Sequence, residues 1–218
     1  MRNSGSVATN AGGTPKSTDA TTLSIWAGQV KADWDRLKAE PDHAERDRQK
    51  PALVQRYWDE YLQDWIASGE TYQNDVLAVV CVWAADVPDC PVLMDLMDAA
   101  VATNQQLPLW LNFKSDLLTH VTDTIRTRAE QVYKNSQQGV VDGQLRAFSL
   151  PDDFHAVLST GWPINFVSLA KCHKLAGLAS ESIGDFNTAL EHYREANKYP
   201  NVGVKTRLEL VEKMVTPQ

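Results

Sequence analysis

The 218-residue sequence has few cysteines and no long apolar run. Its three cysteines, Cys81, Cys90 and Cys172, are an odd number in apolar or helical surroundings, which is typical of reduced thiols and not of a secreted disulfide framework. The most apolar segment, residues 76–85, has about half of the roughly 20 residues that cross a bilayer. No apolar run follows Met1 to form a signal peptide. We therefore expect an intracellular protein that neither spans nor binds a membrane.

The sequence also lacks an excess of positive charge. It carries 21 Lys and Arg against 28 Asp and Glu, with a formal net charge of −7 and a pI of about 5.2. Such a molecule repels polyanions as a whole, so any contact with nucleic acid must come from a local basic cluster. The acidity is concentrated in residues 59–123, which hold eleven acids and the single base Lys114.

Apolar side chains recur at helical spacing along most of the chain, and no segment shows sustained strand alternation. Pro41, Pro88 and Gly139 are expected to end helices, and Asn112 is expected to cap one. The fold class is therefore all-α, a helical bundle or array. The predicted helices lie at residues 21–40, 50–68, 75–86, 91–101, 112–139 and 151–158.

Aromatic residues are concentrated in the segment at residues 50–68, and the apolar segment at 75–86 adds one more. In the first, apolar pairs recur every four residues, so the apolar stripe drifts by about 40° per repeat and forms a broad oblique face. The second has almost no polar face and is expected to be central and buried. Aromatic bulk of this kind indicates either core packing or an oligomer contact, formed by Tyr57, Trp58, Tyr61, Trp65 and Trp83.

The last third of the chain resembles one tetratricopeptide (TPR) unit. Small residues would let two antiparallel helices approach closely, a Gly-Asp pair would form the turn, and two aromatic rings would fill the groove. A final helix at residues 204–215 would cap the exposed end. The alternative is a plain helical hairpin without a peptide-binding role. The residues that carry the pattern are Gly177, Gly184, Phe186, Ala189, Tyr193 and Ala196.

Three stretches together resemble the small terminase subunit of Peduovirus-type temperate tailed phages, a family also catalogued as the terminase endonuclease subunit. The first is YWDEYLQDWIASGETYQNDVLAVVCVWAADVPDC at residues 57–90, and the second is AAVATNQQLP at residues 99–108. The third, at residues 171–214, matches in the order Lys-His-Lys, Gly177, Gly-Asp, Ala-Leu and Gly-Val-Lys. The order and spacing of the three stretches carry the resemblance, which covers about half of the chain.

The resemblance implies a subunit that recognises the packaging site of phage DNA, assembles as a ring and delivers the DNA to a large ATPase and nuclease subunit. Its expected partners are double-stranded DNA, the large subunit and further copies of itself, in the host cytoplasm. The chain is expected to have three regions. Residues 1–20 have almost no bulky apolar side chain and are predicted to be a disordered tail. Residues 21–139 form a helical region to which the resemblance assigns oligomerisation and DNA recognition, and residues 151–218 form the TPR-like region.

The candidate for phosphate contacts is the segment at residues 31–56, which holds seven basic and six acidic side chains. Lys and Arg contacts to phosphates supply most non-specific DNA affinity, and a ring would repeat them. The alternative is a solvated helix surface of mixed charge. The predicted DNA-binding residues are Arg46, Arg48 and Lys50, on a polar connection before the helix at 50–68, with Lys31 and Arg36 in support.

The sequence contains no clear catalytic pattern, so we expect no catalytic residue, cofactor or metal. A His-Asn-His arrangement of His155, Asn165 and His173 is a weak candidate for a nuclease site. The pair Asp152-Asp153 is better explained by the favourable dipole of a first helical turn. A TPR-like protein-binding adaptor without DNA contact and a metal-dependent DNA endonuclease subunit are the alternatives to a non-catalytic packaging subunit.

Overall fold

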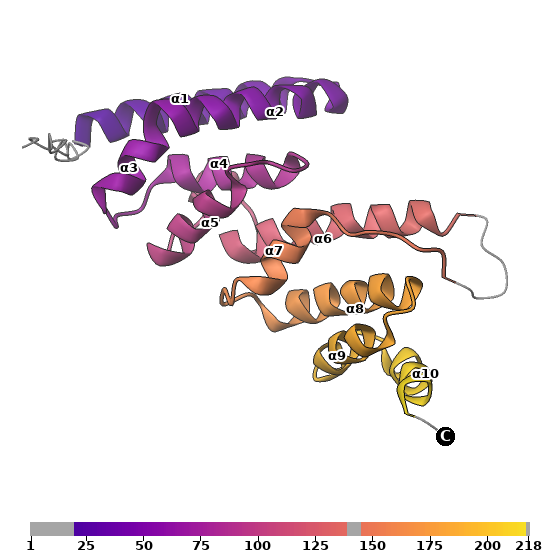
Figure 1. Ribbon diagram of the computed structural model, residues 1–218. Helices are drawn as coiled ribbons and strands as arrows, with labels where there is room; N and C mark the ends of the chain where they lie inside the picture. Colours follow the sequence, from indigo (N-terminus) through magenta and orange to yellow (C-terminus); the bar gives the residue numbers. More distant parts are fainter. Residues whose placement is uncertain (1–19, 139–144, 217–218) are drawn as a thin grey trace, which may run out of the picture.

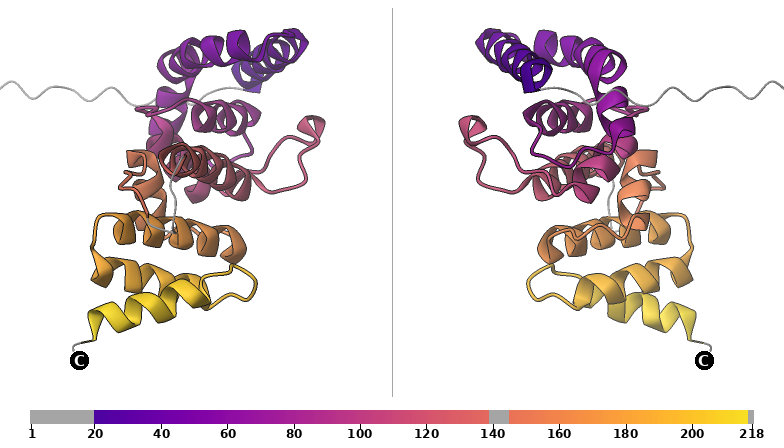
Figure 2. Two further views of the ribbon diagram at one scale, coloured as in Figure 1. Left: turned by 90° about the vertical axis from the view of Figure 1, so that its right-hand side faces the viewer. Right: turned by 90° about the vertical axis from the view of Figure 1, so that its left-hand side faces the viewer.

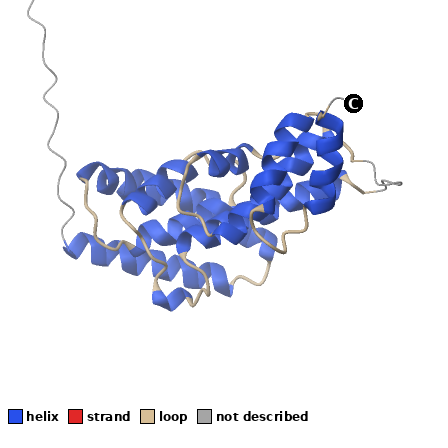
Figure 3. Cartoon of the chain, turned by 90° about the horizontal axis from the view of Figure 1, so that it is seen from below, coloured by secondary structure: helices blue, strands red, loops and turns tan. Residues whose placement is uncertain are grey.

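The computed structural model describes residues 20–138 and 145–216. Across these residues the chain is helical and no strand occurs, which confirms the all-α fold (Figure 3). The disordered tail predicted at residues 1–20 lies, except for Ala20, outside the described residues, as does part of the loop predicted at 139–150.

The helices form a stacked array that runs from α1 and α2 at one end of the molecule to α10 at the other (Figure 1). Helices α1, α2 and α5 pack on α4, α4 packs on α6, α6 on α8, α8 on α9 and α9 on α10. The elements are α1 (Ala20–Ala39), α2 (His43–Tyr57), π-helix η1 (Trp58–Leu62), α3 (Gln63–Ser68), α4 (Asp75–Asp86), α5 (Leu93–Ala102), 3-10 helix η2 (Leu109–Leu111), α6 (Leu117–Ser136), α7 (Asp152–Ser159), α8 (Phe166–Ser182), α9 (Phe186–Asn197) and α10 (Lys205–Val215). No helix among the described residues is long and apolar enough to span a membrane.

The helix predicted to begin at Lys50 begins at His43 instead. Asp42 caps it, because its side chain accepts a hydrogen bond of 2.9 Å from the Ala44 N–H. Pro51 lies inside α2 and does not start it. The segment predicted to be a polar connection therefore forms the first two turns of α2. Its basic side chains are consequently spaced as on a regular helix.

The helical segment at 43–68 is continuous but contains one π-helical turn at Trp58–Leu62. A four-residue apolar repeat drifts around a regular α-helix, whereas a π-turn accommodates an additional residue and reduces that drift. Leu53, Tyr57, Tyr61 and Trp65 consequently all reach the core. The irregularity keeps a long aromatic stripe on one side of the helix.

Helix α4 lies at the centre of the first half of the array. All ten residues from Val76 to Ala85 are buried, and the helix contacts α1, α2, α5 and α6. Asn74 caps its N-terminus by accepting from the Val76 and Leu77 N–H groups. The side chain of Gln105 accepts from the Asn74 N–H at 2.7 Å, which connects the chain after α5 to the start of α4. The predicted burial of this helix is confirmed.

Two predicted helix starts are wrong by a few residues. Asn112 does not cap a helix, because it adopts a left-handed conformation at the end of η2 (φ 55°). Asp116 caps α6 instead and accepts from the Thr119 N–H at 2.8 Å. Pro91 lies in the turn before α5, which begins at Leu93. Asparagine tolerates both a capping and a left-handed conformation, so its identity alone did not distinguish them.

Helices α8 and α9 form the predicted hairpin, and α10 packs on α9. Gly184 takes a positive φ of 81° at the turn, and Asp185 caps α9 by accepting from the Thr188 N–H. Gly177 lies against the Tyr193 ring, so closely that an added Cβ would be 2.5 Å from the ring atom Cε1. Ala189, Tyr193 and Ala196 are buried and Phe186 is half-buried. The assignment of this hairpin to the TPR class stays a prediction.

Candidate nucleic-acid interface

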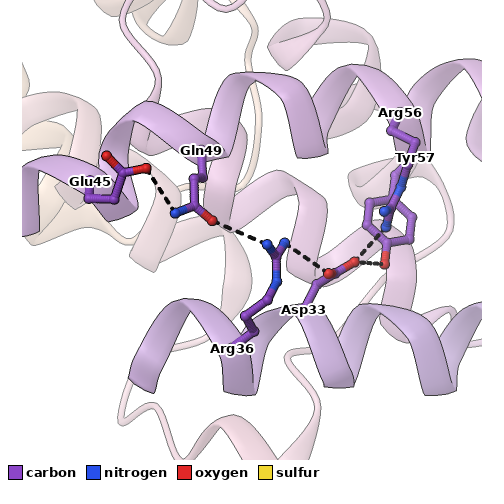
Figure 4. Close-up of polar contacts among 6 residues, drawn as sticks. All are labelled: Asp33, Arg36, Glu45, Gln49, Arg56 and Tyr57. Carbon is purple, nitrogen blue, oxygen red and sulfur yellow. Dashed lines mark hydrogen bonds and ion pairs between the residues drawn. The ribbon is translucent and has the colours of Figure 1, made fainter. Parts of the chain in front are cut away.

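A chain of polar contacts holds α1 against α2 (Figure 4). The Asp33 carboxylate accepts hydrogen bonds from Arg36 (3.0 Å), from Arg56 (2.5 Å) and from the Tyr57 hydroxyl (2.8 Å). Arg36 also donates to the Gln49 side chain at 3.3 Å. Although burial opposes the effect, the hydrogen bonds from Tyr57 and Arg56 hold the pKa of Asp33 below its usual value. Asp33 is therefore the charged centre of the α1–α2 contact.

Beside this contact, α1 and α2 border a pocket of about 380 Å³. Each helix contributes residues at positions i, i+3, i+4 and i+7, the spacing that places side chains on one face of a helix. We call this the α1–α2 pocket. Its wall residues are Lys31, Trp34, Asp35 and Lys38 from α1, and His43, Arg46, Asp47 and Lys50 from α2.

Aromatic side chains form the floor and one side of the α1–α2 pocket. Trp34 stacks on Trp83 of α4 with ring centroids 6.1 Å apart, and Trp110 of η2 meets Trp34 edge-on at 6.2 Å. The Trp110 indole donates to Asp75 at 3.1 Å, which anchors η2 to α4. The Lys31 ammonium lies 5.4 Å from the Trp110 ring centroid, a cation–π distance. The loop that carries η2 projects from the body of the array (Figure 2).

Four of the five predicted DNA-binding residues, all but Arg46, pair with a carboxylate on their own helix. Lys31 pairs with Asp35 at 2.7 Å, Arg36 with Asp33 at 3.0 Å, and Arg48 with Glu45 at 2.5 Å. The pairs of Lys31 and Arg48 are exposed and therefore weak, so the positive charge of these two residues is reduced but not removed. Arg36 and Arg48 do not line the pocket.

Lys50 is the most strongly neutralised of the five. Its side chain is only 16% exposed and pairs with Asp47 (2.8 Å) and with Asp86 of α4 (2.7 Å). Although burial opposes the effect, the hydrogen bonds to Asp47 and Asp86 hold the pKa of Lys50 above its usual value. This lysine joins α2 to α4, so it has little freedom to meet a phosphate.

Arg46 keeps its charge available, because its only side-chain contact in the described part of the chain is with His43. Lys38, which the sequence-based selection omitted, also lines the pocket, is exposed, and has no carboxylate partner among the described residues. The signal for Lys38 was present in the sequence, since it follows Lys31 by seven residues and so shares its helix face. Arg46 and Lys38 are thus the two available cations of the pocket.

The residues proposed for core or oligomer packing lie inside a single chain. Tyr57, Tyr61, Trp65 and Trp83 are each no more than 4% exposed, and only Trp58 is half-buried. Their apolar area is therefore covered by α1, α4 and neighbouring turns. The burial of these rings needs no second copy of the chain.

The residues of the weak nuclease candidate have structural contacts of their own. Asn165 caps α8 by accepting from the Val167 N–H at 2.9 Å, and His173 meets His192 of α9 with 3.1 Å between the two Nδ1 atoms. Asp152 is exposed in the first turn of α7, as the dipole argument predicts. In residues 20–138 and 145–216, no three His, Cys, Asp or Glu side chains come together in a metal-binding group.

Asp153 has a role that the dipole argument missed. It is buried and pairs with Arg128 of α6. Arg128 also donates to the Ala85 carbonyl at the end of α4, at 2.6 Å. This arginine therefore connects α4, α6 and α7. No local pattern predicts this pair, because its members are 25 residues apart in the chain.

These features define an all-helical protein with a basic, aromatic-floored surface at one end. A family model described as the phage small terminase subunit matches residues 28–149, more than half of the chain. The chain belongs to this family and is thus a DNA-packaging small subunit. No curated protein and no solved structure matches it.

The matched segment runs from α1 to the residue before Leu150. It contains the first two stretches of the sequence resemblance, at 57–90 and 99–108. The third stretch, at 171–214, lies outside it. The α1–α2 pocket lies in the matched segment, whereas the α8–α9 hairpin does not.

Proposed function

We propose that this subunit recognises the packaging site of viral DNA through the α1–α2 surface, assembles as a ring and delivers the DNA to the large terminase subunit. It would act in the cytoplasm of the infected host. The proposal rests on one observation: two available cations, Lys38 and Arg46, line the same pocket as the aromatic rings of its floor. Family membership supports DNA as the ligand.

The small number of available cations in each chain supports the proposal of a ring. A single chain of net charge −7 that offers two such cations on this surface would bind DNA weakly. In a ring, each bound subunit holds the DNA close to the same surface of its neighbours. Several weak sites then give a higher overall affinity than one site alone. A monomer at every concentration in light scattering would contradict the ring.

The DNA contact is tested by fluorescence anisotropy of a labelled packaging-site duplex at several salt concentrations. We expect Lys38→Ala/Arg46→Ala to weaken binding by about tenfold or more at low salt, and to reduce the slope of log K against log salt by about 0.9 for each lost phosphate contact. The matched control is Lys205→Ala/Lys213→Ala, which removes two exposed lysines from α10. Equal affinities for the two variants would contradict the proposed surface.

The binding assay and a separate DNA-cleavage assay test the two alternatives. A wild-type protein that fails to bind DNA even at low salt would indicate a protein-binding adaptor. DNA nicking with magnesium or manganese that is lost in His155→Ala or His173→Ala would indicate an endonuclease subunit. We expect binding that weakens as salt rises, and no nicking.

A further inference from the structure

A second pocket, of about 400 Å³, lies between α6 and α8 and is separate from the α1–α2 pocket. The two helices pack against each other in the middle of the array (Figure 1). Four basic side chains border the pocket, Arg126 and Lys134 from α6 and Lys171 and Lys174 from α8, against the single acid Glu130. We call it the α6–α8 pocket. Its positive excess stands out in a chain whose net charge is −7.

The lysines of the α6–α8 pocket are not neutralised by carboxylates. Lys134 and Lys171 are exposed and have no ion-pair partner among the described residues. Lys174 donates to the Val202 carbonyl at 2.9 Å, a contact that fixes the ammonium without cancelling its charge. Only Arg126 is paired, with Asp123 and Glu130 of its own helix. Three ammonium groups thus share one pocket with a single carboxylate at its border.

Helical spacing explains why these side chains converge. Lys171 and Lys174 are three residues apart, so they lie on one face of α8. Arg126 and Lys134 are eight residues apart, close to two turns, and share a face of α6. Gathering like charges costs free energy, and a bound anion would offset that cost. Tyr133 adds an apolar wall with a hydroxyl group.

We propose that the α6–α8 pocket binds a phosphate group. Ammonium groups supply several donors and a concentrated positive charge, which suits the oxygens of a phosphate. The phosphate could belong to the DNA backbone or to a free phosphate compound such as a nucleotide. The DNA source rests on the proposed function, whereas phosphate binding itself does not.

The test measures pyrophosphate binding by calorimetry and DNA binding by anisotropy, on the full chain. Lys134→Ala/Lys171→Ala is compared with the α10 control Lys205→Ala/Lys213→Ala, which has the same change in charge. Both pairs are exposed, so we expect unchanged circular dichroism and urea unfolding. We expect pyrophosphate binding to weaken by about tenfold in the first variant and to persist in the control.

The DNA arm identifies the source of the phosphate. If DNA affinity and its salt slope fall in Lys134→Ala/Lys171→Ala but not in the control, the pocket holds a backbone phosphate, whether or not pyrophosphate binds. If pyrophosphate binding is lost and DNA affinity is unchanged, the ligand is a free phosphate compound. Wild-type behaviour of the variant with both probes overturns the proposal. Lys38→Ala/Arg46→Ala, measured alongside, reports separately on the α1–α2 surface.

Discussion

The two ends of this molecule bury their helices in different ways. Around α4, large rings such as Trp34, Trp83 and Tyr57 fill the space between helices. In the α8–α9 hairpin, Gly177 lets the Tyr193 ring of the facing helix approach closely. The first arrangement depends on apolar bulk and the second on the absence of a side chain. The same type of substitution should therefore have different effects at the two ends.

The largest expected effect is the removal of a ring beside α4. Trp83 is 1% exposed and contacts both Trp34 and Tyr57. Trp83→Ala should lower the free energy of unfolding by about 3–5 kcal/mol, because it removes buried apolar area and leaves a cavity. Urea unfolding measures the loss, with Leu109→Ala as the control, since Leu109 is 98% exposed. A loss below about 1 kcal/mol would mean that the rings around α4 repack freely.

An intermediate effect is expected where a methyl group enters the hairpin. Gly177→Ala places a Cβ against the buried Tyr193 ring, whose hydroxyl is fixed by a 2.6 Å hydrogen bond to Glu181. Overpacking costs about 1–3 kcal/mol, which outweighs the gain of about 1 kcal/mol in helix propensity. Gly28→Ala in α1 is the matched control, because nothing lies within 4 Å of its added Cβ.

The sign of the two changes makes this pair informative. Gly28→Ala should raise the free energy of unfolding by up to about 1 kcal/mol, while Gly177→Ala should lower it. Thermal and urea unfolding of both variants measure the difference. If both substitutions stabilise the protein, close packing at Gly177 is not what holds the hairpin.

The smallest expected effect is a pH dependence confined to the hairpin. Burial lowers the pKa of both His173 and His192, and the nearby charge of His192 lowers that of His173 further. The charge of Glu195 opposes the lowering of both pKa values, and Glu191 opposes it more strongly at His192. The nearby charges of Lys198 at His173 and of His155 at His192 lower the two values further. The unfolded chain therefore binds protons first as the pH falls below about 6.5. The two neutral histidines therefore make their full contribution to the free energy of unfolding above that pH. The contribution is lost as the pH falls from there through the lowered pKa values of the folded protein.

The measurement compares unfolding of the wild type and of His192→Gln at about pH 7.5 and about pH 5.5. The wild type should lose more stability on acidification, because His192→Gln removes one of the two coupled rings. Carboxylates elsewhere titrate alike in both proteins and cancel in the difference. Equal losses would show that the imidazole contact does not contribute to the stability of the hairpin.

Predictions that depended on local pattern were accurate. The apolar run at 75–86 specified a buried helix, and the Gly184-Asp185 pair specified the hairpin turn. Helix starts were predicted less accurately, as with Asn112, because one residue type can either cap a helix or adopt a left-handed conformation.

The candidate site was only partly visible in the sequence. The basic segment at 31–56 was identified, yet the sequence did not show which of its cations are neutralised. The local pair of Lys50 with Asp47 is visible in the sequence, but its second pair, with Asp86 36 residues away, forms only in the folded chain. The α6–α8 pocket was missed for the same reason, because Lys134 and Lys171 meet only through the packing of two helices.

The sequence by itself determined that this protein is helical, which helix is central and where the hairpin turns, because periodicity, capping and glycine conformation act over a few residues. Tertiary structure alone decided which charges pair across helices, as Lys50 does with Asp86, and which cations gather around one pocket. Electrostatic interactions depend on distances of a few ångströms between segments far apart in the chain. Those distances exist only once α1, α2, α4, α6 and α8 have packed.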